Sequence, residues 1–314
     1  MKTFYLDKIT EPLEACVATI GYFDGVHRGH RFLISHVIDE AKRSKLPSMV
    51  ITFDRHPREV LQSDYVPERL TTLDEKLVLL SKTGIDVCVV MSFSEDLSHL
   101  SAKEFMQQVL KEQLNVSKLM IGYDNRFGHN RAEGFRDYVV YGRELGIEVV
   151  QNTSFGLHGV NVSSSVVRNH IKSGEIEMAN ACLGYPYMLC GKVVDGHQEG
   201  RKMGFPTANL DVSEDKKLIP APGVYAVRAR LLNSMQYKRG MLNIGTRPTF
   251  AGDKLTIEVH ILNFSDEIYG EELLVEFVHR MREEQKFDSI EALVEQLHKD
   301  EEMVDRQFDK EIDE

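Results

Sequence analysis

The architecture of the first half of the chain can be inferred from one segment, ACVATIGYFDGVHRGH, which occupies residues 15–30. Its first six residues form an apolar run of strand length, and the next ten contain three glycines. Apolar residues then recur at helical spacing from Leu33 to Ala41. This order predicts a buried strand, a glycine-containing turn and an amphipathic helix.

Short apolar runs continue to alternate with helical patterns as far as about residue 180. Further strands are expected at residues 49–53, 87–91, 119–122 and 147–150, with a helix over 102–114. Alternating strands and helices predict a Rossmann-like α/β domain, in which a parallel sheet carries helices on both faces. Ligands of such sheets bind beyond the carboxyl ends of the strands, where the turns lie.

The second half has a different pattern. Strand-like runs separated by Gly, Pro, Asn and Asp are expected at 187–194, 223–232, 237–244, 255–262 and 273–278. One helical pattern follows, over residues 289–307. Several strands closed by one helix predict a small antiparallel β-barrel with a C-terminal helix. We place the domain boundary between residues 183 and 184, which gives domains of 1–183 and 184–314.

Composition restricts the class of protein. At 314 residues the chain is about twice the usual domain length, which agrees with two domains. The longest aliphatic run, residues 87–91, is far shorter than the ~20 residues of a membrane helix, and charged Asp7 and Lys8 interrupt any signal peptide. A net charge of −11 argues against a nucleic-acid partner. We therefore expect a cytoplasmic protein with no membrane or nucleic-acid partner.

Two histidines at the start of the first predicted helix point to phosphate chemistry. His27 and His30 can donate hydrogen bonds to phosphate oxygens, and a helix N-terminus adds a favourable partial charge. The simpler interpretation is a glycine turn with surface histidines, and zinc is disfavoured because further ligands are missing. The turn residues expected to contact the nucleotide are Gly21, Phe23, Asp24 and Gly25.

Three more segments place polar side chains where such a site needs them. Two follow predicted strands, and the third begins a helix whose serines can cap N–H groups or an anion. Each segment alone is better explained by a turn or a helix cap than by a site, but together with His27 and His30 they form a set suited to phosphates. The side chains that these segments add are His56, Asp124, Asn125, Ser164, Ser165 and Arg168.

The His27–His30 motif, together with Ser164, Ser165 and Arg168, resembles the nucleotidyltransferase superfamily. The form GYFDGVHRGH is similar to that of the bacterial bifunctional riboflavin kinase/FMN adenylyltransferase (FAD synthetase) family. The resemblance implies transfer of AMP from ATP to FMN, which yields FAD and pyrophosphate. This reaction needs no side-chain base because the attacking phosphate is already an anion, so positioning and electrostatic stabilisation suffice.

A second candidate site lies in the predicted barrel, within residues 191–209. Its glycines and basic residues suit nucleotide phosphates, and Thr207 and Asn209 offer oxygens to Mg²⁺. The chain has no Walker A motif and no protein-kinase signature, so any kinase here follows another design. The residues expected to bind the nucleotide in this segment are Gly196, Gly200, Lys202, Gly204 and Pro206.

The second half resembles the riboflavin kinase module of the same family. The matching motifs are GFPTAN at 204–209, PAPGVYAV at 220–227, NIGTRPTF at 243–250 and EVHILNF at 258–264. The resemblance implies that Glu258 is the catalytic base, and a ribityl hydroxyl attacking the γ-phosphate of ATP does need a proton acceptor. Riboflavin would be converted to FMN with MgATP, leaving ADP, and Arg280 would belong to the ligand-binding residues.

The chain departs from the family pattern at four positions. Ser165 stands where threonine is usual, Arg55 where proline is usual, Asn125 where phenylalanine is usual and Asn263 where aspartate is usual. Three other functions remain open to test. They are a nucleotidyltransferase for a pantetheine or nicotinate nucleotide, a class I aminoacyl-tRNA synthetase, which shares His-x-Gly-His, and a flavin-binding regulatory protein without turnover.

Overall fold

The structure, a computed structural model, describes residues 1–61, 64, 66–123, 125–157, 159–196, 199–249 and 252–310. The chain forms two compact units, Met1–Ser164 and Ser165–Glu314. The domain boundary expected at 183/184 stays a prediction; the segment between it and Ser165 lies with the second unit. Asp124, expected to bind the nucleotide, lies outside the described residues.

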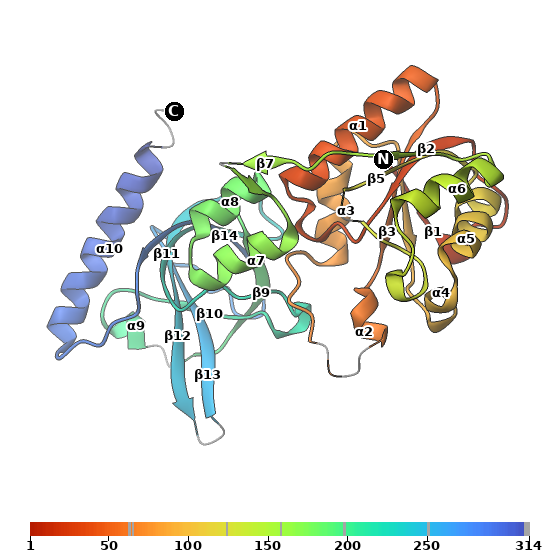
Figure 1. The fold of residues 1–314 in the computed structure, drawn as a ribbon. Coiled ribbons are helices and arrows are strands. Elements are labelled where there is room, and N and C mark those ends of the chain that lie inside the picture. Colours follow the sequence, from red (N-terminus) through yellow and green to blue (C-terminus); the bar gives the residue numbers. More distant parts are fainter. Residues whose placement is uncertain are drawn as a thin grey trace. The chain divides into compact units, whose positions relative to one another are not determined.

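The first unit contains a six-stranded parallel sheet with the strand order β1-β4-β3-β2-β5-β6 (Figure 1). The strands are β1 (Lys2–Tyr5), β2 (Cys16–Ile20), β3 (Ser48–Phe53), β4 (Val87–Met91), β5 (Val116–Ile121) and β6 (Glu148–Gln151). The five predicted strands are confirmed. Strand β1 was missed because its residues are mostly exposed, so they form no apolar run.

Helices cover both faces of this sheet, as predicted. Alternate residues such as Ala18, Ile51 and Leu119 pack against η3 and α6, whereas α1 contacts β2 and β3 without joining that cluster, which places it on the other face. The helical segments are η1 (Leu6–Lys8), η2 (Asp24–Val26), α1 (Arg28–Ser44), α2 (Pro57–Leu61), α3 (Leu73–Ser81), α4 (Glu95–His99), α5 (Ala102–Phe105), the π-helical η3 (Met106–Gln113), η4 (His129–Arg131) and α6 (Phe135–Leu145). A short hairpin, β7 (Gly156–Leu157) and β8 (Val160–Asn161), follows.

The second unit is a closed antiparallel barrel, in the order β10-β13-β12-β11-β14-β9. Helix α7 (Ser164–Ser173) starts at the last residue of the first unit and continues in the second. The other elements of the second unit are α8 (Ile176–Leu183), β9 (Met188–Val194), α9 (Glu199–Lys202), β10 (Ala208–Asp211), η5 (Ser213–Asp215), β11 (Gly223–Leu231), β12 (Lys238–Thr249), β13 (Gly252–Ile261), β14 (Glu272–Arg282) and α10 (Ile290–Lys310). The barrel and its closing helix are confirmed. Two short elements inside the glycine-rich segment, α9 and β10, were missed because four residues carry too little periodicity.

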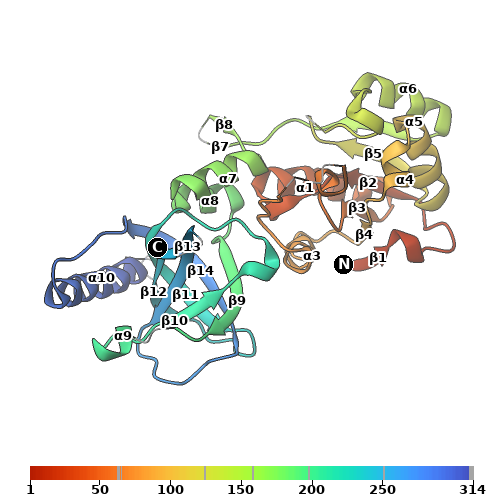
Figure 2. The ribbon, with the colours of Figure 1, turned by 90° about the horizontal axis from the view of Figure 1, so that it is seen from below.

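Helix α10 packs on the outside of the barrel against β12, β11 and β14, and it lies beside these strands in both views (Figures 1 and 2). Its side chains Val304 and Phe308 pack with Phe205 of the loop before β10. The fully buried carboxylate of Asp300 accepts from the Arg282 guanidinium at 2.7–3.2 Å, and from Gln296 Nε2 at 2.9 Å. These bonds compensate the cost of burying the charge and hold α10 to the end of β14.

Candidate active sites

The turn between β2 and α1 has an uncommon backbone. Phe23, Gly25 and Val26 all have positive φ angles, of 54°, 77° and 36°. A Cβ on Gly29 would lie 2.9 Å from Val162 O and 3.1 Å from the His27 ring, so glycine is required where α1 begins. The sequence therefore folds back tightly at the carboxyl end of β2, where a parallel sheet binds its ligands.

Asp24 holds this turn in place. Its carboxylate is 2% exposed and accepts from the backbone N–H groups of Leu70 and Thr71 at 3.1 Å. The Thr71 hydroxyl donates to it at 3.2 Å, and the Ser164 hydroxyl donates to Asp24 O at 3.0 Å. Both Asp24 and Ser164 were expected to bind nucleotide; in the structure these hydrogen bonds join parts of the protein itself.

The two histidines of the motif come together at the N-terminus of α1. His27 caps the helix, because its Nδ1 accepts from His30 N at 3.3 Å, which places the proton of a neutral imidazole on Nε2. The two rings are stacked with their centroids 3.6 Å apart, and the edge of Phe23 contacts His30 at 5.0 Å. His27 is only 3% exposed, so the motif is more buried than surface histidines would be.

Lys76 was not identified from the sequence. It lies on α3 and is 2% exposed, with Nζ donating to Tyr22 O at 3.1 Å and to Phe53 O at 2.7 Å. Its burial lowers the pKa of the ammonium group to about 8, against the opposing attraction of Asp24. The sequence contained one signal for its burial: Lys76 lies at helical spacing from Leu79 and Leu80, which are buried on the same helix. Lys76 joins the turns that follow β2 and β3.

A cavity of about 540 Å³ opens at the carboxyl ends of the strands, as the fold predicts. We call it the aromatic cavity, because Phe53, Phe93, Phe105 and Phe127 line it. Gly21, His56 and Asn125, all predicted site residues, also line it. Asn125 Nδ2 donates to Ile20 O at 2.5 Å, so the residue that departs from the family pattern ties the segment after β5 to β2. The ring of His56 contacts that of Tyr22 at 5.0 Å.

Two predicted residues of this site, Ser165 and Arg168, lie on α7 and belong to the second unit. Their position beside the histidines stays a prediction.

The second site is assembled by strand register. Asn209 of β10 and Asn243 of β12 are both paired with Glu258 of β13, so the three side chains share one face of the sheet. The buried neighbours Ile257 and Val259 point to the opposite face. Thr207 Oγ1 lies 3.4 Å from Glu258 Oε2. These four residues form what we call the Glu258 cluster.

Asn243 had not been singled out as a site residue. It opens the NIGTRPTF motif, and its pairing with Glu258 could be found only once the register of β12 and β13 was known.

Glycine is required at several positions of the loop before β10, because a larger residue would clash or would strain the backbone. A Cβ on Gly196 would lie 2.0 Å from Asn209 Nδ2, and one on Gly200 would lie 2.3 Å from Phe205 O. Gly204 has a φ of +87°. Pro206 O accepts from His260 Nδ1 at 2.7 Å. The loop thus closes onto the Glu258 cluster, while the side chain of Lys202 is exposed.

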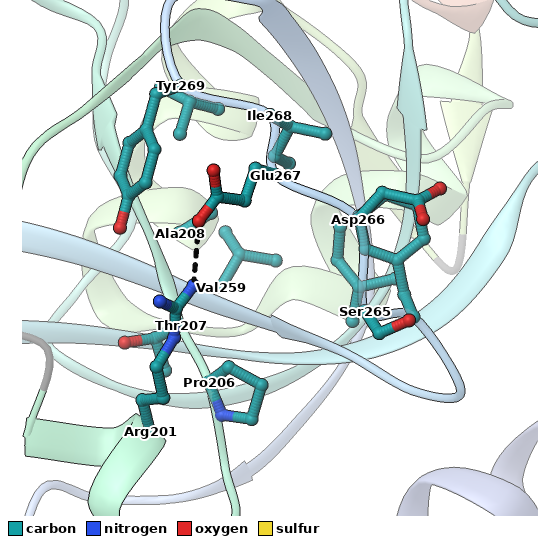
Figure 3. Close-up of a pocket in the computed structure, with 13 residues that line it drawn as sticks. Arg201, Pro206, Thr207, Ala208, Val259, Ser265, Asp266, Glu267, Ile268 and Tyr269 are labelled. Atoms are coloured by element: carbon teal, nitrogen blue, oxygen red, sulfur yellow. Dashed lines mark ion pairs between the residues drawn. The ribbon is translucent and has the colours of Figure 1, made fainter.

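A pocket of about 340 Å³ adjoins this cluster and contains Thr207 (Figure 3). Its aliphatic lining includes Val193 and Val259. Arg201 and Glu267 point toward each other and form an ion pair at 3.7 Å, and Tyr269 lines the same pocket. The segment 265–269, which also lines the pocket, was missed, because its side chains join the pocket only through the fold.

Arg280 is half-buried and makes its contacts within the second unit. Its Nη2 donates to Pro222 O at 2.8 Å, and a Cβ on Gly174 would lie 2.8 Å from the guanidinium carbon. The side chain predicted to bind a ligand therefore packs against the loop after α7.

Two family models match the chain, one in each half. Residues 9–166 match the family model for FAD synthetase, and residues 183–308 match that for riboflavin kinase. A "Bifunctional riboflavin kinase/FMN adenylyltransferase" of Escherichia coli (strain K12) is 38% identical over 297 residues, covering 95% of this chain and 94% of the relative. The protein of the same name from Bacillus subtilis (strain 168) is 34% identical over 319 residues, covering 98% of each chain.

A solved structure, titled "Crystal Structure of Macrolide-efflux Protein from Streptococcus pneumoniae", has a TM-score of 0.87 to this chain. It is 31% identical and covers 97% of this chain and 99% of its own. Among the described residues, no helix is both long enough and apolar enough to cross a membrane. Both family models and the full-length relatives lead to one conclusion: the chain belongs to the family of bifunctional riboflavin kinase/FMN adenylyltransferases.

Proposed function

We propose that the two reactions of this riboflavin kinase and FMN adenylyltransferase use separate sites. The Glu258 cluster would phosphorylate riboflavin to FMN, and the site at the start of α1 would adenylylate FMN to FAD. ATP is the co-substrate of both reactions. The observation that carries the proposal is that one carboxylate, Glu258, stands between Asn209 and Asn243 in a unit matched by the riboflavin kinase model. We also propose a cytoplasmic location, since both reactions consume ATP.

In the kinase reaction, Glu258 would accept the proton of the terminal ribityl hydroxyl of riboflavin. The O–H bond breaks as that oxygen bonds to the γ-phosphorus of ATP, and the bond from phosphorus to the bridging oxygen of ADP breaks. The Thr207 hydroxyl, 3.4 Å from Glu258 Oε2, would orient the carboxylate. The 340 Å³ pocket that contains Thr207 would hold the adenine nucleotide.

Thr207 and Asn209 would hold Mg²⁺ together with the phosphates of ATP. Their side-chain oxygens are of the hard type that Mg²⁺ prefers, and Gly196 leaves room for the Asn209 amide, which a Cβ would occupy. When bound, Mg²⁺ would neutralise part of the negative charge of the phosphates. Gly200, Gly204, Lys202 and Pro206 would shape the loop around those phosphates.

In the adenylyl transfer, a phosphate oxygen of FMN would attack the α-phosphorus of ATP, and pyrophosphate would leave. No side-chain base is required, because the attacking oxygen is already anionic. His27, His30 and the N-terminus of α1 would stabilise the negative charge that develops on the phosphates. Ser165 and Arg168 would add to the anion site. The aromatic cavity would take the isoalloxazine ring of FMN.

A flavin time course tests this division. Purified protein is incubated with riboflavin, ATP and Mg²⁺, and FMN is expected to appear before FAD. Thr207→Val should raise the Mg²⁺ concentration needed for half-maximal FMN formation about tenfold, by removal of one oxygen ligand. The Mg²⁺ dependence of FAD formation from supplied FMN should stay unchanged. Equal shifts in both reactions would contradict separate metal-dependent sites.

A further inference from the structure

We propose that Tyr138 is a positioning residue for FMN in the adenylylation reaction, because it fixes the wall of the aromatic cavity formed by Phe127 to Arg131. This inference rests on the proposed function, in which that cavity takes the isoalloxazine ring. Tyr138 itself does not line the cavity.

Tyr138 lies on α6 and is fully buried. Its ring is stacked on that of Phe127, with centroids 4.1 Å apart and planes 12° apart. Its hydroxyl accepts from Phe127 N at 3.0 Å and lies 3.1 Å from Phe127 O and 3.0 Å from Glu133 O, either of which can accept its proton. A single hydroxyl group therefore holds both ends of the segment 127–133.

The segment between these ends is strained. Gly128, Asn130 and Arg131 have φ angles of 89°, 56° and 51°, in the left-handed region that non-glycine residues rarely adopt. Such backbone conformations persist only where the surroundings determine them. The Tyr138 hydroxyl is one of the contacts that determine this segment.

The opposite side of the segment is bonded to a second part of the cavity lining. His129 N donates to Leu100 O at 2.8 Å, and His129 Nδ1 donates to Ser98 O at 2.9 Å. Ala102 N donates to Glu133 Oε1 at 3.3 Å, and a Cβ on Gly128 would lie 2.6 Å from Ala102 N. The segments 97–105 and 127–133 thus form one hydrogen-bonded wall.

A fixed wall matters for a rigid, planar ligand. Tyr138 orients the Phe127 ring, and the Phe105 ring lies 5.5 Å from it, so two aromatic surfaces of the cavity are held in place before the ligand binds. Preorganised aromatic surfaces raise affinity by lowering the ordering cost on binding. His27 and His30 are not part of this wall, so its loosening should affect FMN binding more than the transfer step.

Tyr138→Phe is the direct test, because it keeps the stacked ring and removes only the hydroxyl. The KM for FMN in FAD formation should rise about tenfold, the effect of losing one buried hydrogen-bonding group. We expect kcat, the KM for ATP and the rate of riboflavin phosphorylation to change less than twofold. Tyr141→Phe, on the same helix and outside the cavity lining, is the matched control and should have no effect.

Two further variants distinguish an error in the role of Tyr138 from an error in the proposed function of the cavity. Phe127→Ala tests the proposed function: an unchanged KM for FMN would mean that the flavin does not bind in this cavity. If Phe127→Ala raises that KM while Tyr138→Phe leaves it unchanged, the role of Tyr138 is wrong and the cavity assignment stands. Gly128→Ala, which pushes the segment away from Ala102, should raise the same KM. A fall in kcat together with a rise in the KM for ATP in Tyr138→Phe would indicate general loosening and overturn the proposal.

Discussion

The two active sites of this chain are built in different ways. In the first unit, buried charged groups that bond to the backbone hold the turns around the site: Asp24 binds the N–H groups of Leu70 and Thr71, and Lys76 binds the carbonyls of Tyr22 and Phe53. In the barrel, by contrast, the register of paired strands brings Asn209, Asn243 and Glu258 together. A substitution can therefore damage the geometry of the first site without touching a reacting group, whereas a conservative substitution of Glu258 in the second site should remove chemistry alone.

The largest effect is expected for Glu258→Gln. The amide cannot accept the ribityl proton, so the rate of FMN formation should fall by about 10²–10⁴-fold. FAD formation from supplied FMN should persist, because Glu258 lies in the other unit. Separate assays of the two reactions measure both effects. Equal loss of both activities in a folded variant would contradict the two-site assignment.

The converse variant, His27→Asn, is the control for Glu258→Gln. The carboxamide oxygen can still accept from His30 N and cap α1, while the imidazole is lost. FAD formation should fall about 10²–10³-fold, and FMN should accumulate from riboflavin. Undiminished FAD formation would show that the imidazole is not needed.

A smaller effect, on geometry and stability, is expected for Asp24→Ala. The N–H groups of Leu70 and Thr71 lose their buried acceptor, which should destabilise the first unit by about 4 kcal/mol. Amide hydrogen exchange should show faster exchange at these two positions, while amides of the barrel keep their protection. FAD formation should fall and FMN formation should not. The exposed Asp74, in the same unit, gives the control variant Asp74→Ala; an equal effect there would contradict the anchoring role.

This contrast also explains what could be predicted from the sequence. Apolar runs such as residues 16–20 identify strands because burial selects every residue in them, so the sheet and the barrel were both predicted. Glu258, Thr207 and Asn209 were found through local motifs. Lys76 and Asn243 were missed, because each acquires its role from a partner distant in the chain, Tyr22 or Glu258. Asp24 was found but not its function as an anchor, for the same reason.

The smallest effect concerns Lys76 and appears only as a dependence on pH. Burial lowers its pKa in the folded chain to about 8 from an ordinary value of 10.5. Between these values the unfolded chain binds a proton that the folded chain has released, so the free energy of unfolding rises with pH. This contribution is fully present above pH 10.5 and is lost as the pH falls through about 8. Over the whole window it amounts to about 3 kcal/mol.

Lys76→Met should remove this dependence, since methionine fills the space without a titrating group. The measurement is the free energy of unfolding of the first unit at pH 7.5 and 10, for wild type and variant. Burial raises the pKa of Cys16 and Cys88 to about 12, which lowers stability over pH 9–12, but both thiols are present in both proteins and cancel in the difference. The free energy of unfolding of wild type minus that of Lys76→Met should therefore rise with pH. The same difference for Lys82→Met, a variant of an exposed lysine, should not change with pH. If this difference is flat or falls with pH, burial does not lower the pKa of Lys76. The first site would then not depend on a buried charge at this position.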